Sequence, residues 1–202
     1  MTSYQKMDEG QYWEIVENSL AKAYDQTSQE AFLNVYLSQL PSEEIIAFEC
    51  RHQELLRASH NSDLWCAAAI INNGCSDDGF HYFKAWLISR GKEVFTAALK
   101  DPDGTLYRVV DPTVEFYEFE FFNYSAAYAY EAKTGKDIFD VLPENHSALP
   151  SIKIKWDLAS EDTVKAICPK LFSLYEKLSQ QRRLPQPRRR IQPGEFRQRF
   201  RR

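Results

Sequence analysis

Apolar residues recur at spacings of three and four along much of the chain, which is the pattern of amphipathic helices. A first helix is predicted to begin near Asp8 and Glu9, with an apolar stripe that continues to Tyr24. A second is predicted from Thr27, which forms a capping-box signature with Glu30. The apolar stripe predicted for this second helix is Ala31, Phe32, Val35, Tyr36 and Leu40.

Pro41 interrupts the pattern, and a third helix is predicted from Ser42. The Ser42 hydroxyl is expected to cap that helix, since Glu43 and Glu44 follow it in the first turn. Its apolar face is predicted to be Ile45, Ile46, Phe48, Leu55 and Leu56, and its polar face Glu44, Arg51, His52 and Glu54.

The segment from Leu64 to Ile71 is apolar on all sides, so it is predicted to be a central, fully packed helix that ends at Asn72, Asn73 and Gly74. Another helix is predicted to open at Ser76 and to end or bend at Gly91. A strong turn is predicted at residues 101–104, which read Asp-Pro-Asp-Gly.

Aromatic residues are dense between residues 114 and 133. Tyr117, Phe121, Tyr124 and Tyr128 are spaced as on one helix face, although the alternation at 117–121 leaves a short strand as an alternative. Residues 139–159 are expected to include an extended segment that lies on the body. Ser160 is expected to cap a last helix, in which Pro169 marks a kink or the true start.

The predicted fold class is therefore all-α, with one possible short strand or extended segment. We expect one helical domain at residues 1–178 and a disordered Arg/Pro-rich tail at residues 179–202. The composition, 44% hydrophobic and 27% charged, is that of a globular protein. No apolar run approaches the roughly 18–20 residues that span a bilayer, and no signal-peptide pattern is present, so a cytoplasmic protein is expected.

The formal net charge of −4 is unevenly distributed. Residues 179–202 contain nine arginines and one acid, a charge of +8, which leaves −12 on residues 1–178. Guanidinium groups pair with phosphates through two parallel hydrogen bonds, so the tail is predicted to bind an anionic surface or nucleic acid. The arginines predicted to bind are Arg188, Arg189, Arg190, Arg197, Arg199, Arg201 and Arg202.

Residues 64–88 read LWCAAAIINNGCSDDGFHYFKAWLI and contain a tryptophan-led helix, a Gly-Cys-Ser-Asp-Asp-Gly-Phe junction and a Phe-x-x-Trp-Leu helix. With the YWEIVE segment at residues 12–17 and GKEVF at 91–95, this resembles a bacterial family known only as a domain of unknown function. The resemblance covers roughly residues 8–135. It implies a helical fold in a bacterial cytosol and carries no assigned activity.

The Gly74–Gly79 junction is the best local candidate for chemistry. Cys75 is expected beside the positive end of a helix, where a reactive thiolate is favoured. Asp77 lies four residues and Asp78 three residues before His81, so either carboxylate can form an acid–base pair with that imidazole. The same residues also suit a purely structural role, with Ser76 as the helix cap and His81 on a solvated face.

No metal site is predicted, because the four cysteines and four histidines lack the spacing of zinc ligands. No cofactor and no small-molecule ligand are predicted either, since phosphate-loop and hydrolase motifs are absent. The first functional hypothesis is an interaction protein whose acidic body binds a protein partner and whose tail binds a polyanion. The alternatives are an enzyme centred on Cys75, Asp77, Asp78 and His81, and a nonspecific nucleic-acid binder.

Overall fold

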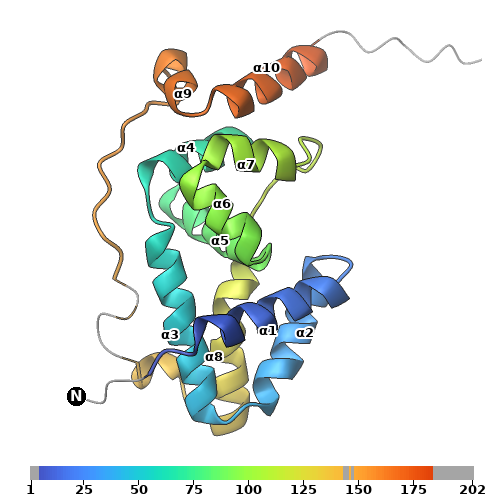
Figure 1. Cartoon of the computed structure of the whole chain (residues 1–202), viewed down its shortest axis with the longest axis vertical. Coiled ribbons are helices and arrows are strands. Elements are labelled where there is room, and N and C mark those ends of the chain that lie inside the picture. Colours follow the sequence, from blue (N-terminus) through green and yellow to red (C-terminus); the bar gives the residue numbers. More distant parts are fainter. Residues whose placement is uncertain (1–4, 143–145, 147, 184–202) are drawn as a thin grey trace, which may run out of the picture.

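The computed structural model describes residues 5–142, 146 and 148–183, and all regular secondary structure in these residues is helical (Figure 1). This confirms the all-α class. The helices are α1 (Glu9–Lys22), α2 (Gln26–Gln39), α3 (Ser42–Ala58), α4 (Ser62–Ile71), α5 (Asp77–Ser89), α6 (Lys92–Lys100), α7 (Pro102–Val109), α8 (Glu120–Thr134), the 3₁₀ turn η1 (Ile138–Asp140), α9 (Glu161–Ile167) and α10 (Pro169–Arg183).

The helices form two connected groups. In the first, α8 packs against α2 and α3, and α1 crosses α2 (Figure 1). In the second, α4 lies among α5, α7 and α10, while α6 packs against α7. Helix α5 joins the groups, because it contacts α1, α3 and α8 as well as α4 and α6.

A buried hydrogen-bond chain ties three helices of the first group together. The Tyr12 hydroxyl of α1 lies 2.8 Å from His52 Nδ1 of α3, and His52 Nε2 lies 3.0 Å from Asn123 Oδ1 of α8. Because an amide oxygen only accepts, Nε2 carries the imidazole hydrogen and Nδ1 accepts from Tyr12. The predicted place of His52 on a polar face is therefore wrong, since its side chain is enclosed between helices and only 1% exposed.

The prediction of a fully packed helix at residues 64–71 is confirmed. Three consecutive alanines of α4, Ala67 to Ala69, are at most 1% exposed, so neighbouring helices approach it on several sides. The helix stops as expected, because Asn73 and Gly74 have positive φ angles of 53° and 117°. Asn61 caps its start, where the side-chain oxygen accepts from the Leu64 amide at 2.9 Å.

Two predicted helix caps and one predicted turn are wrong, although α3 begins at Ser42 as expected. Helix α2 begins one residue after Asp25, whose carboxylate and Ser28 form the capping box in place of Thr27 and Glu30. Pro41 occupies the N-cap position of α3, without a side-chain hydrogen bond, so the Ser42 hydroxyl is not the cap. The expected turn at 101–104 is the start of α7, because Asp101 caps it and Pro102 fits its first position.

Two predicted apolar faces are also wrong. In α2 the buried residues are Gln29, Leu33 and Leu37, while Val35 of the predicted stripe is 61% exposed. In α8, which begins only at Glu120, the buried set lies around Phe122, Ala126 and Ala129, and Phe121 is 50% exposed. Tyr24 lies beyond the end of α1 and is 90% exposed.

The expected extended segment is confirmed, and it runs along one side of the molecule to α9 (Figure 1). It is attached to Ser62, whose hydroxyl accepts from the Lys155 amide at 3.1 Å and whose carbonyl accepts from Trp156 Nε1 at 2.8 Å. No strand occurs at 117–121 or elsewhere in the residues that the structure describes. Pro169 is the first residue of α10, as one of the two predicted alternatives stated.

The predicted start of a disordered tail at residue 179 is wrong, because α10 continues to Arg183. The predicted tail arginines from Arg188 to Arg202 lie outside the described residues. Within the described part of the chain, none of the helices combines the length and apolar character that crossing a membrane requires.

Candidate functional site

The start of α5 has the local architecture that the sequence predicts. The Ser76 hydroxyl accepts a hydrogen bond from the Gly79 amide at 3.1 Å and caps the helix. Asp77 and Asp78 are exposed in the first turn, where their charge complements the helix dipole. The capping and dipole roles of these three residues are thus confirmed.

Cys75 does not have the thiolate character expected of it. Its side chain is half-buried, and burial together with the charges of Glu118 and Asp77 raises the pKa of its thiol to about 12. The dipole of α5 by itself favours the thiolate. The structure adds burial and a carboxylate from the segment before α8, both of which favour the neutral thiol.

His81 is partly buried and does not pair with the aspartates. Burial and the nearby Lys84 ammonium lower the pKa of His81 to about 4, which outweighs the attraction of Asp78. In the described structure no hydrogen bond or ion pair joins His81 to either Asp77 or Asp78. The predicted acid–base pair is therefore not formed, and the imidazole is neutral near pH 7.

The structure instead gathers four carboxylates at the starts of α5 and α8. We call Asp77, Asp78, Glu118 and Glu120 the acidic face. The Phe119 amide donates to the Tyr82 carbonyl at 3.1 Å, which brings the start of α8 against α5. The Tyr82 hydroxyl then donates to Glu120 Oε1 at 3.1 Å.

Two further observations place these acids together. A Cβ added to Gly79 would lie 3.2 Å from Glu118 Oε1 and 3.6 Å from Cys75 Sγ, so Glu118 lies over the first turn of α5. Burial and the charge of Glu120 raise the pKa of Glu118. Burial and the Glu120 hydrogen bond raise the pKa of Tyr82 to about 12.

Within the described residues, the acidic face has no ion-pair partner. The ion pairs of the described residues join other carboxylates, such as Glu54 to Lys6 and Asp63 to Lys155, and none includes a residue of the acidic face. Its four negative charges are therefore available to a cationic group from outside.

Sequence reasoning missed Lys84, the most unusual charged residue near this region. Its side chain is fully buried, and Nζ lies 3.4 Å from both the Leu56 carbonyl oxygen and His60 Nδ1. Burial lowers the pKa of Lys84 to about 8. A signal was available, because Lys84 lies four residues after Phe80 and three before Leu87, on the buried face of α5.

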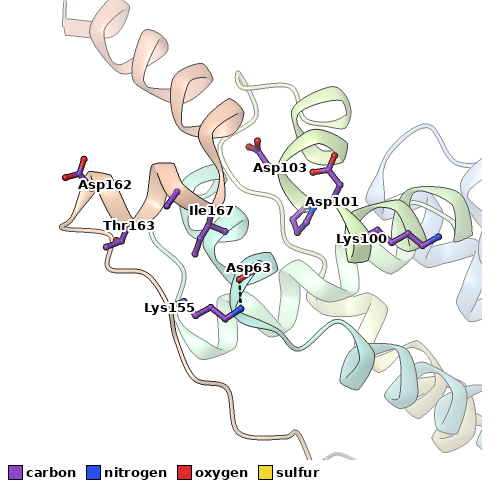
Figure 2. A pocket seen from close by; sticks show the side chains of 10 residues that line it. Asp63, Lys100, Asp101, Asp103, Lys155, Asp162, Thr163 and Ile167 are labelled. Atoms are coloured by element: carbon purple, nitrogen blue, oxygen red, sulfur yellow. Dashed lines mark hydrogen bonds and ion pairs between the residues drawn. The ribbon is translucent and has the colours of Figure 1, made fainter.

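A second group of acids lines a cavity of about 580 Å³ between α4, α7 and α9 (Figure 2). Asp101 caps α7, and the Asp103 carboxylate accepts from the Lys170 and Leu171 amides at the start of α10. Asp63 pairs with Lys155 at 3.4 Å, and Asp162 points away from these side chains in Figure 2. Asp63, Asp101 and Asp103 therefore have structural roles, and the described residues contain no group of three or more metal-ligating side chains.

Residues 7–132 match the model of a family described as proteins of unknown function, DUF4240. The chain belongs to this family. The match runs from α1 into the last turn of α8, so it contains the acidic face and Lys84. The extended segment, α9, α10 and the arginine-rich tail follow it. No curated protein and no solved structure matches the chain.

Proposed function

We propose that the chain is an interaction protein whose acidic face binds a lysine- or arginine-rich segment of a protein partner. The observation that carries the proposal is the absence of any ion pair to Asp77, Asp78, Glu118 or Glu120 within the described structure. The charge of −12 on residues 1–178 acts in the same direction, because it attracts a basic partner at long range.

The surroundings of the acidic face suit guanidinium and ammonium groups. The Tyr82 ring is partly exposed and Phe121, next to Glu120, is 50% exposed. Cations bind favourably over such rings, and arginine also forms paired hydrogen bonds with a carboxylate. A basic segment therefore gains ion pairs and ring contacts at the same place.

Matched charge variants test the proposal. Asp78→Asn with Glu120→Gln removes two charges from the acidic face, whereas Glu131→Gln with Asp137→Asn removes two exposed charges beyond it. The full-length chain and both variants are used as baits in nuclease-treated lysate, with quantitative mass spectrometry of the bound proteins. We expect a set of proteins with basic segments that the control variant retains and the acidic-face variant loses at least fivefold.

Equal recovery by the two variants, or recovery of no protein by the unchanged chain, contradicts the proposal. The lost proteins are then tested singly, because a direct contact with the acidic face predicts weaker binding as salt is increased.

The charge of +8 on residues 179–202 favours a second, separable activity. We propose that Arg188, Arg189 and Arg190 take part in binding a phosphate-rich polyanion. Changing all three to Gln in the full-length chain is expected to lower affinity for a fluorescent single-stranded RNA and to reduce the salt dependence. Changing Lys133, Lys136 and Lys153 to Gln gives the matched control. Equal loss in both triple variants contradicts a specific role of the tail.

A further inference from the structure

Lys84 has an incomplete set of electrostatic partners. Its ammonium group has three hydrogens, and the acceptors are the Leu56 carbonyl oxygen and His60 Nδ1, each at the long distance of 3.4 Å. The Phe80 ring centroid lies 5.2 Å from Nζ. Among the described residues no carboxylate pairs with Lys84, although a buried ammonium is stable only with good compensation.

The titratable groups nearest to Lys84 do not replace a counter-ion. His52 on α3, His60 after α3 and His81 on α5 all have their pKa values lowered, by burial first and by the Lys84 charge as a further cause. The imidazoles are therefore uncharged near pH 7. The charge of Asp77 favours the protonated form of His60 but does not outweigh burial, and the Asp77 side chain is exposed and makes no ion pair with Lys84.

A pocket of about 280 Å³ lies over this cluster. It is lined by His60, Trp65, Asp77 and Lys84 and, on the other side, by the extended residues 149–152. Trp65 is stacked on Phe80 with ring centroids 4.8 Å apart, which gives the pocket a flat apolar wall. Leu149 and Ile152 add aliphatic surface opposite.

We propose that this pocket binds a small monocarboxylate with an apolar body, whose carboxylate becomes the counter-ion of Lys84. His60 is partly exposed and accepts from Lys84 only at 3.4 Å, so an entering carboxylate oxygen takes its place as acceptor. The apolar body then lies along Trp65. Asp77 lines the same pocket and disfavours a second negative charge, so a monoanion is preferred to a phosphate dianion.

Benzoate is the probe, and benzamide is its neutral control of nearly the same shape. With the full-length chain we expect saturable binding of benzoate by calorimetry and a matching rise in the thermal midpoint. Benzamide and inorganic phosphate should bind at least tenfold more weakly. The affinity for benzoate should fall above about pH 8, where Lys84 loses its proton.

Lys84→Met keeps the length of the side chain and removes the charge, so it should abolish the preference for benzoate over benzamide. Asp77→Asn is the second variant, since it leaves Lys84 in place and removes an opposing charge. It should strengthen benzoate binding about threefold. No saturable benzoate binding, equal binding of benzamide, or a Lys84→Met variant that still prefers benzoate overturns the proposal.

Discussion

At Cys75, burial and neighbouring carboxylates outweigh the favourable dipole of α5. We predict slow alkylation of Cys75 by iodoacetamide at pH 7.5, because only the thiolate reacts. Raising the pKa from its ordinary value to about 12 lowers the thiolate fraction by a large factor. The rate should be about 100-fold or more below that of the same cysteine in urea, measured by mass spectrometry of its peptide. Similar folded and unfolded rates would contradict the assignment.

Glu49 is a buried acid on α3 whose only hydrogen-bond partner in the described structure is Gln53, at 2.8 Å. Burial raises the pKa of Glu49 to about 7, so the folded chain holds a proton that the unfolded chain releases at lower pH. The native state is therefore destabilised as pH rises from about 4.5 to 7.

Glu49→Gln removes this ionisation while retaining a hydrogen-bonding side chain. Relative to the unchanged chain, the variant should gain about 2 to 3 kcal/mol in free energy of unfolding between pH 5 and pH 8. Urea unfolding at both pH values measures the gain. Glu43→Gln, on the exposed part of the same helix, is the control and should show no such gain.

At the scale of elements, Asp103 anchors one helix to another. Its carboxylate on α7 accepts from the Lys170 and Leu171 amides. These amides lie in the first turn of α10, where they have no acceptor within the helix. Asp103→Ala should cost about 2 kcal/mol and should speed amide exchange at Leu171. Asp162→Ala on α9 is the control, because the Asp162 side chain is exposed and accepts no hydrogen bond in the described structure. Equal effects of the two changes would argue against the anchor.

The elements differ in how well the sequence predicts them. Helix α4 is predicted well, because a segment that is apolar on all sides has only one suitable environment, the interior. Helices α2 and α8 carry apolar residues on several faces, so periodicity alone does not decide which face is buried. The packing of α2 against α8 decides it, and leaves Val35 and Phe121 exposed.

The candidate site shows the same limit. The Ser76 cap and the first turn of α5 depend on neighbouring residues, and both are predicted from the sequence. Glu118 and Glu120 lie beside that turn only because the chain folds back on α5. Glu120, which contacts Tyr82, follows it by 38 residues in the sequence. This long-range contact creates the acidic face and changes the chemistry of Cys75, and no local pattern of residues encodes it.

At the scale of the whole molecule, the change in stability at acid pH depends on groups whose pKa values are shifted in opposite directions. The pKa of His52 is lowered to about 4 and that of Glu49 is raised to about 7, both mainly by burial. Between pH 5 and 6 the unfolded chain binds the extra proton at His52, and the folded chain binds it at Glu49. Their effects on the slope of stability against pH therefore nearly cancel.

His81 and His60 add a further slope, and the raised pKa of Glu118 acts in the opposite direction. The pKa values of the two histidines are lowered in the folded chain, so their contribution to stability is present above the ordinary histidine pKa and is lost as pH falls through this window. Stability should therefore rise with pH between 5 and 6.5. His81→Gln should flatten this rise, whereas Glu49→Gln should steepen it, as measured by urea unfolding in steps of half a pH unit. An unchanged slope in His81→Gln would show that its imidazole is not held neutral by burial beside Lys84.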